Sequence, residues 1–305
     1  MLRLAIAASF VALSASLTGC MPPTTAYRYS AYAPAARPIS FDGRTAPAGS
    51  LHVEGNAAST WVWTNDAPQV HDTALFIPKW TAEGAILLAV SSHVELGVRG
   101  AYADYAWAQP SALGTMPVPN APASIGWGPE VRLSFPLDEQ KHLALGIAGN
   151  FMSYQVPYAE WRLVNAGIAS SSNQPPCSTS AASCDGYTLV DTKTESHWVY
   201  TLGLYPSYAF GDRGQYGHLF GLVDWTNGFA NDGFTNQPST GSTVTSVGPI
   251  WIFGGGYGFR YEWLQASVLA YLPMTERSSP VDYGPGLMFT IGVNAPLWTR
   301  AESSD

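Results

Sequence analysis

Alternation of apolar and polar residues with a period of two dominates the chain over residues 50–298. Such alternation is typical of β-strands with one apolar and one polar face. In the fourth predicted strand, for example, Trp127 and Val131 share one face, whereas Glu130 and Arg132 share the other. No heptad pattern and no long amphipathic helix is evident. Ten strands are predicted in this way: 50–63, 85–90, 94–107, 125–137, 142–158, 197–210, 216–227, 244–261, 263–273 and 283–298.

The connections between these strands alternate in length. The odd-numbered connections are long and the even-numbered ones are tight turns. The long connections are 64–84, 106–124, 159–196, 228–243 and 274–282. This predicts an all-β fold, an up-and-down antiparallel barrel of about ten strands with tight turns at one end. An even number of strands places both ends of the barrel on the side of the tight turns.

The composition favours a transmembrane barrel. Only 12% of the residues are charged, whereas 13% are aromatic, and many Trp and Tyr residues lie near predicted strand ends. Aromatic side chains at strand ends are typical of a lipid–water interface. The apolar face of each strand would then contact lipid. A soluble up-and-down barrel shows the same alternation and remains the alternative. The net charge of −8 and the lack of a basic patch argue against nucleic acid as a partner.

The N-terminus has the features of an export signal. Arg3 precedes an uncharged, mostly apolar run that extends to Leu17, and the sequence Leu17-Thr18-Gly19-Cys20 follows. This motif resembles the lipobox of bacterial lipoproteins. The resemblance implies that residues 1–19 are a signal peptide, that Cys20 receives lipid, and that the lipoprotein-processing machinery is a partner. In that family Asp after the cysteine retains the protein at the inner membrane, so Met21 indicates the outer membrane.

Residues 20–49 are rich in Pro and Ala and are interpreted as a tether between the lipid and the barrel of residues 50–298, with a tail at 299–305. The barrel resembles bacterial outer-membrane β-barrel proteins. That resemblance implies contact with outer-membrane lipid and with the barrel-assembly machinery. Members of this class usually end at an aromatic residue, whereas here Trp298 is followed by the tail. Cys20 is expected at the outer membrane on the periplasmic side, where the tight turns lie.

Two further cysteines, Cys177 and Cys184, lie in the long connection 159–196. An exported protein enters an oxidising compartment, so a disulfide within this loop is predicted. A metal site at this pair is the weaker interpretation, because no histidine is near in sequence. No cofactor is expected, and the loops are where unknown surface partners would bind.

Charged residues on the polar faces of the strands are the candidate site. They are expected to face the lumen and to form a charge network: Glu54, Glu95, Arg99, Glu130, Arg132, Asp224 and Arg260. Unpaired charge in a narrow interior is costly, so Glu95–Arg132 and Arg99–Glu130 are predicted cross-strand pairs. The network would either fill the lumen or line a narrow pore, and a filled lumen is the favoured interpretation.

No catalytic arrangement is evident in the sequence. His218 and Asp224 share a face of one strand but are about 20 Å apart at about 3.3 Å per residue, which excludes a catalytic pair. The leading hypothesis is therefore a non-enzymatic outer-membrane lipoprotein barrel, a structural or surface component with, at most, a narrow passage for solutes. The alternative is a lipid-tethered soluble periplasmic barrel that binds a hydrophobic ligand. A lipid-modifying enzyme of the outer membrane is the third hypothesis.

Overall fold

The computed structural model of the protein describes residues 26–30, 36–64, 75–108, 123–163, 187–211, 216–230, 232–235, 245–261, 263–275 and 281–297. Its strands are β1 (Ala26–Ser30), β2 (Ser50–Thr64), β3 (Leu75–Ser91), β4 (Val94–Ala108), β5 (Ser124–Pro136), β6 (Leu143–Leu163), β7 (Tyr187–Ala209), β8 (His218–Ala230), β9 (Asp232–Thr235), β10 (Thr245–Tyr261), β11 (Leu264–Met274) and β12 (Val281–Pro296). No helix in the described part of the chain is long and apolar enough to span a membrane.

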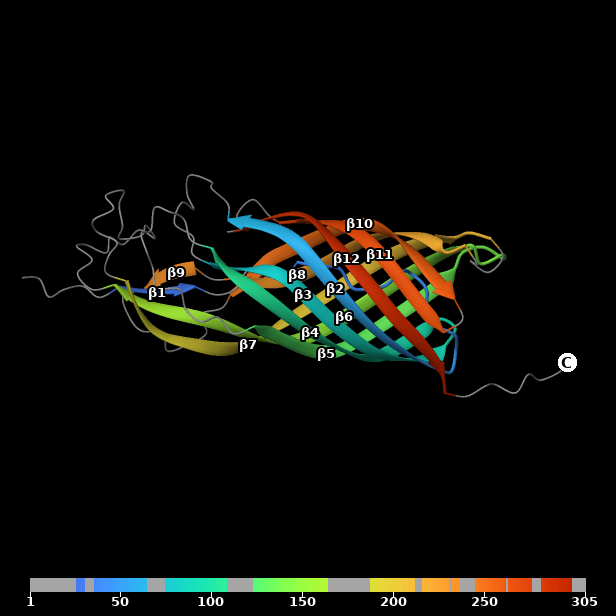
Figure 1. The fold of residues 1–305 in the computed structure, drawn as a ribbon, viewed down its shortest axis with the longest axis horizontal. Coiled ribbons are helices and arrows are strands. Elements are labelled where there is room, and N and C mark those ends of the chain that lie inside the picture. Colours follow the sequence, from blue (N-terminus) through green and yellow to red (C-terminus); the bar gives the residue numbers. More distant parts are fainter. Residues whose placement is uncertain are drawn as a thin grey trace, which may run out of the picture.

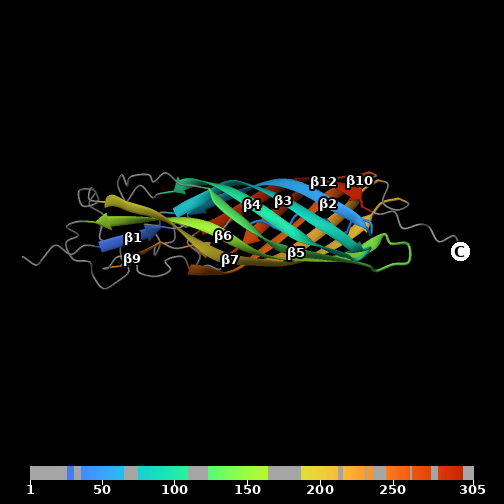
Figure 2. The same cartoon turned by 90° about the horizontal axis from the view of Figure 1, so that it is seen from below.

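Ten of these strands close into an antiparallel barrel, which Figures 1 and 2 show from two sides. Each barrel strand pairs with its neighbours in the chain, with β8 next to β10, and the pairing of β12 with β2 joins the last strand to the first. The predicted fold class, an up-and-down all-β barrel of about ten strands, is therefore confirmed. We call the end where β3–β4, β5–β6, β7–β8 and β10–β11 are connected the turn end, and the opposite end the loop end.

Two strands are much longer than the sequence pattern predicts. β3 begins at Leu75 rather than at residue 85, and β7 begins at Tyr187 rather than at residue 197. In β3 the register with β4 shifts between Pro78 and Trp80, which interrupts the alternation. The alternation of connection lengths is also less strict than predicted, because a short connection, 275–280, joins β11 to β12 at the loop end.

The outer surface of the barrel is an apolar band. On β7 the outward side chains from Trp198 to Tyr208 are apolar or aromatic and exposed, including Leu202 and Leu204. Ten residues at about 3.3 Å each, tilted by about 40°, span about 25 Å, which matches the apolar band of transmembrane barrels. Before Trp198 the exposed outward positions of β7 are mostly polar, with Thr194 as an example. The apolar band thus ends on β7 near Trp198.

Residues 36–49, which we call the lumen segment, lie inside the barrel. Most of them are buried, and their contacts are with inward-facing side chains of strands that are far away in sequence. Gly49 ends the segment with φ +81, a left-handed conformation that suits glycine, and the chain then enters β2 at the turn end. Residues 36–49, interpreted from the sequence as part of a tether between the lipid and the barrel, thus lie within the barrel interior. The earlier segment β1 lies at the loop end, beside β6 and β9 (Figures 1 and 2).

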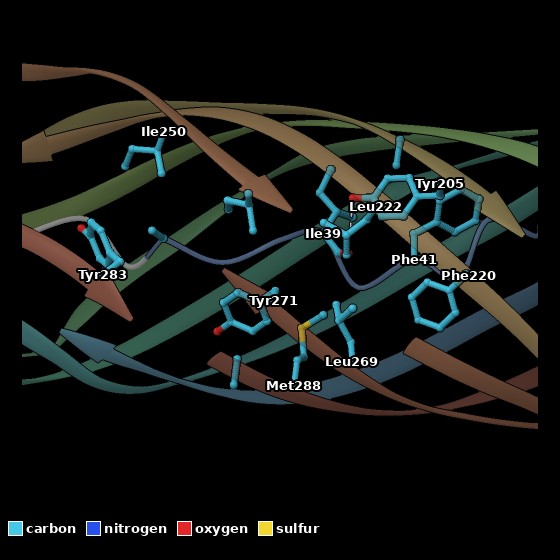
Figure 3. Close-up of a cluster of buried hydrophobic side chains, with 14 residues drawn as sticks. Ile39, Phe41, Tyr205, Phe220, Leu222, Ile250, Leu269, Tyr271, Tyr283 and Met288 are labelled. Atoms are coloured by element: carbon cyan, nitrogen blue, oxygen red, sulfur yellow. Dashed lines mark hydrogen bonds between the residues drawn. The ribbon is translucent and has the colours of Figure 1, made fainter. Parts of the chain in front are cut away.

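Apolar side chains of the lumen segment pack against the inner wall. Figure 3 shows Ile39 and Phe41 among inward side chains that include Tyr205, Leu222 and Leu269. The rings of Phe41 and Tyr205 meet edge to face, with centroids 5.2 Å apart. These side chains form an apolar core inside the barrel. The lumen segment contributes part of this core, so the interior is filled by both polar and apolar contacts.

Candidate functional site

The lumen contains a buried charge network built on the inward faces of β2, β3, β4 and β5. Alternation along each strand turns these side chains inward, and they come from adjacent strands. The network comprises four carboxylates, two guanidinium groups of the wall and one histidine: Glu54, Glu83, Glu95, Glu130, Arg99, Arg132 and His52. Each of these side chains is at most 2% exposed. Unpaired charges so deeply buried would be very costly, so the wall is stable only as a paired set.

Arg99 on β4 is the centre of this network. Its Nη2 atom is 2.6 Å from Glu54 Oε1, and its Nη1 atom is 2.8 Å from Glu83 Oε2. Its Nε atom also donates to Glu130 Oε2, which lies on the next strand, and Nη2 donates to Glu130 Oε1 at 3.0 Å. One guanidinium therefore joins carboxylates from β2, β3 and β5, using its planar set of donors.

Arg132 on β5 links two of these carboxylates, Glu54 and Glu130, to Glu95. Its Nε atom donates to Glu130 Oε1 at 2.6 Å, its Nη1 atom donates to Glu54 Oε2 at 3.0 Å, and Nη1 is 3.8 Å from Glu95 Oε2. The guanidinium carbon also lies 5.2 Å from the ring centroid of Phe41 in the lumen segment. The charge network thus contacts the lumen segment directly.

The lumen segment is fixed to the wall at three levels. Nearest the loop end, Arg37 Nη2 pairs with Glu83 and donates to the hydroxyl of Tyr154 at 2.6 Å. Farther along, the backbone N–H of Ile39 donates to Asp224 Oδ2 at 2.8 Å, and the Tyr205 hydroxyl donates to the same oxygen at 2.7 Å.

The third level lies nearest the turn end. Asp42 accepts hydrogen bonds from Arg260 Nη2 and Gln265 Nε2, each at 2.8 Å, and lies 3.0 Å from His218 Nε2. Beyond it, the backbone N–H of Ala46 donates to Glu95 Oε1. Side chains from most of the barrel circumference therefore contact the lumen segment, through its backbone and its side chains.

The candidate residues named from the sequence fall into three groups. Glu54, Glu95, Arg99, Glu130 and Arg132 meet in the charge network, and both expected pairs, Glu95–Arg132 and Arg99–Glu130, are present. Asp224 is apart from them and holds Ile39. Arg260 is also apart from them and holds Asp42, as does His218. The sequence thus located the inward charges but not their partners in the lumen segment.

Sequence reasoning missed Glu83, Arg37 and Asp42. Glu83 lies in a stretch interpreted as a loop, and residues 36–49 were interpreted as a tether. The available signal was charge balance: Arg37, Asp42 and Arg44 form an alternating charged set in an otherwise uncharged, Pro-rich stretch. Cys20, Cys177 and Cys184 lie outside the described residues. Within the described part of the chain, no three His, Cys, Asp or Glu side chains are arranged to hold a metal ion.

A small cavity lies beside the lumen segment. A cavity of about 30 Å³ is lined by Arg37, Glu83 and Tyr154 among others. A water molecule needs about 10–15 Å³ on this measure, so the cavity holds about two waters. It does not hold a solute. The wall and the lumen segment together therefore close this part of the barrel interior.

No family model matches the chain, and no curated protein matches it. Among solved structures, the translocator domain of autotransporter NalP from Neisseria meningitidis is 12% identical, with 83% of this chain and 91% of that chain covered and a TM-score of 0.40. An outer membrane channel from Pseudomonas putida F1 is 12% identical, with 85% and 99% covered and a TM-score of 0.38. LpxR from Salmonella typhimurium is 8% identical, with 79% and 99% covered and a TM-score of 0.37. These distant likenesses concern the barrel fold alone.

Proposed function

We propose that this chain is an outer-membrane lipoprotein barrel with a closed lumen, which acts as a non-enzymatic structural or surface component. The observation that carries the proposal is the occupied interior. The lumen segment crosses the barrel between the level of Glu83 and the turn end, and the wall around it carries a network of buried ion pairs. A barrel filled in this way offers its outer surface and its loops for function rather than a wide channel.

Residence in the outer membrane is supported by the outer surface of the barrel. Exposed large apolar side chains occur all around it, and Trp61 and Trp127 lie toward the loop end of their strands. A contiguous apolar surface of this size is too large for a soluble monomer. The alternative, a soluble tethered barrel with a ligand inside, also has to place that ligand in an interior that is already filled.

The chemistry outside the described residues belongs to the same proposal. Cys20 carries lipid after removal of residues 1–19, Cys177 and Cys184 form a disulfide, and the partners are outer-membrane lipid and the lipoprotein-processing and barrel-assembly machinery. Mass spectrometry of the mature protein tests the lipid and the disulfide together. An unmodified Cys20, or free thiols at the other two cysteines after non-reducing purification, would count against these assignments.

Planar bilayer recording tests the closed lumen. The purified full-length protein is expected to insert without steady conductance at any moderate voltage. Detergent partitioning and faster migration on an unheated gel than on a boiled one establish that the inserted protein is a folded barrel. Reproducible open-channel steps from the unmodified protein would contradict the closed lumen. A chain without residues 1–20 that is soluble and monomeric in buffer would contradict the membrane barrel itself.

A narrow, gated passage is the second candidate, and one observation favours it. The lumen segment forms no strand pairing with the wall over residues 36–49, and the contacts at its first two levels are few hydrogen bonds and ion pairs. The double variant Arg37→Ala/Asp224→Ala removes the wall contacts at these two levels. Conductance that appears in this variant but not in Arg44→Ala, which removes a contact at the turn end, would support gating. Silence in both variants supports the permanently closed barrel.

The non-enzymatic part of the proposal has its own test. Purified protein is incubated with outer-membrane lipid extract, and the lipids are analysed by mass spectrometry for loss or transfer of acyl chains. Unchanged lipid is expected. Turnover that grows with protein concentration and disappears on boiling would overturn this part while leaving the closed barrel in place.

A further inference from the structure

The N-terminal strand β1 lies at the loop end, outside the apolar band. It pairs with β6 from Ala26↔Leu163 to Ser30↔Ala159, on the edge of β6 that β5 occupies farther down the barrel. β9 pairs with the other edge of β1. Both figures show β1 and β9 at the end of the molecule opposite to the end where β12 finishes (Figures 1 and 2).

The height of β1 above the band follows from the register. Ala159 and Leu163 of β6 pair with Thr192 and Tyr187 of β7, and the exposed Trp198 marks the end of the apolar band on that strand. Six and eleven residues at about 3.3 Å, tilted by about 40°, place the two ends of β1 about 15 Å and about 28 Å beyond Trp198.

Chain length then limits where Cys20 can lie. Ala26 is the sixth residue after Cys20, so about 21 Å of fully extended chain separates them at most. The near edge of the apolar band is about 28 Å from Ala26, and the far edge, at the turn end, is about 25 Å farther. The chain between Cys20 and Ala26 cannot return to the turn end.

We propose, as an extension of the lipoprotein assignment above, that the barrel displays its own N-terminus at the loop end, so that the lipid-modification site Cys20 lies on the same side of the membrane as the long loops. The lumen segment passes through the barrel interior to connect this N-terminus with β2 at the turn end. If the long loops are on the outside of the cell, the lipid-modified residue lies on the outer side of the outer membrane. The sequence pattern alone had suggested the opposite side.

Labelling of single cysteines in intact cells tests the proposal. The background carries Cys177→Ser and Cys184→Ser, and three variants are compared: Thr24→Cys near the lipid site, Thr194→Cys at the loop end, and Glu139→Cys in a tight turn. Thr194 and Glu139 are both exposed, which makes them reference positions for the two sides. A membrane-impermeant maleimide is expected to label the first two in intact cells and the third only after the outer membrane is disrupted.

The comparison separates the two proposals. If the Thr24→Cys variant is labelled under the same conditions as the Glu139→Cys variant, rather than under those of the Thr194→Cys variant, the inference is overturned. Labelling of the Glu139 variant alone in intact cells means that the barrel has the opposite orientation. The surface exposure in the proposed function is then wrong, while the placement of Cys20 with the loops stands. Protection of all three positions would indicate that the barrel does not cross the outer membrane.

A crosslink tests the placement of β1 whichever way the barrel is oriented. Tyr29 and Glu160 are directly paired on β1 and β6, at Cα separations of about 4.5–5.5 Å that suit a disulfide. In the same background, Tyr29→Cys/Glu160→Cys is expected to oxidise to one intramolecular disulfide in the folded, purified protein. The control Tyr29→Cys/Glu139→Cys joins positions at opposite ends and is expected to stay reduced. Crosslinking of the control rather than the test pair would overturn the inference.

Discussion

Arg99 forms ion pairs with three carboxylates at once. Removing one carboxylate leaves Arg99 with two partners, whereas removing Arg99 takes a charged donor from all three carboxylates. Glu54, Glu83 and Glu130 each lose a charged donor when the guanidinium is removed, and none of them has access to solvent. Such a side chain adds little net stability compared with an apolar packing of the same volume, but its removal alone leaves buried charge uncompensated. The network therefore fixes which residues may occupy this part of the lumen.

The variant Arg99→Met is expected to lower the free energy of unfolding by about 3–5 kcal/mol, because it leaves three buried carboxylates with too few donors. The temperature at which the folded band disappears on an unheated gel, calibrated by urea unfolding in detergent, measures this loss. Lys79→Met is the matched control, since Lys79 pairs with Asp104 at 3.7 Å on the exposed surface. A surface pair contributes about 0–1 kcal/mol, so equal losses in the two variants would contradict the central role of Arg99.

Asp224 offers a comparison of two substitutions at one buried position. Asp224→Ala removes the acceptor of both the Ile39 N–H and the Tyr205 hydroxyl and is expected to cost about 1–3 kcal/mol per orphaned donor. Asp224→Asn keeps a side-chain oxygen at this position and should cost less. Digestion by a protease with sites in residues 36–49 checks the local effect, because a released lumen segment is cut faster. Equal digestion of both variants would contradict a role for the acceptor.

Among the elements, the tight turns show how local chemistry sets the barrel register. In the β5–β6 turn the Asp138 carboxylate accepts the backbone N–H groups of Leu143 at 2.7 Å and His142 at 3.0 Å, while Leu137 N donates to Leu143 O. Lys141 adopts φ 57 to complete the reversal. Partial desolvation acts to raise the pKa of Asp138, but these hydrogen bonds to its charged form outweigh it and hold the pKa below the usual value.

The sign of the resulting pH dependence follows from linkage. A carboxylate whose pKa is lower in the folded state stabilises that state above its unfolded pKa of about 3.9, and this contribution is lost as the pH falls through the folded pKa. Asp138→Ala is thus expected to lower the thermal midpoint at pH 7, by an amount that shrinks below about pH 4. Glu139→Ala, a change at an exposed neighbour, serves as control. A midpoint difference that is the same at pH 3 as at pH 7 would exclude the turn carboxylate as its source.

The elements also show what the sequence could and could not reveal. Alternation located all ten barrel strands because lipid outside and a polar interior impose opposite requirements on adjacent residues. It failed where one of these requirements is absent. β7 before Trp198 lies beyond the apolar band and is mostly polar on its outward face, so no alternation marks it. The lumen segment has no lipid face at all, and its place in the barrel depends on long-range partners such as Glu83 and Asp224 that no local pattern encodes.

At the scale of the whole molecule, the barrel has two surfaces with opposite chemistry. The inner surface pairs every wall arginine of the charge network with carboxylates, whereas the outer surface exposes Ile291, Leu202 and Phe289 between aromatic residues. The outer band spans about the thickness expected of a transmembrane barrel, and the polar extension of β6 and β7 continues beyond it. The surroundings of the outer surface therefore change along the barrel axis: they are aqueous at the turn end, lipid at the apolar band, and aqueous again at the loop end.

A charge placed on the outer surface reports this change of solvent. Ile291→Arg, near the middle of the band, is expected to lower the free energy of unfolding in lipid vesicles by about 2–4 kcal/mol. Thr194→Arg, at an exposed position on the extension of β7, is expected to be nearly neutral. Unfolding by guanidinium in phosphatidylcholine vesicles compares the two. Equal effects would place both residues in the same solvent and would contradict the position of the band.

The course of residues 36–49 also restricts the order in which the barrel can be built. This stretch is continuous with β2, and β2 is one side of the seam that β12 closes. An N-terminal segment drawn through a finished ring would have to pass Arg99 and Glu54. The alternative is that residues 36–49 are laid against the curved sheet first and the seam forms last around them. Biosynthesis then proceeds from the inside outward, and a chain truncated before β12 would leave its innermost residues open to attack.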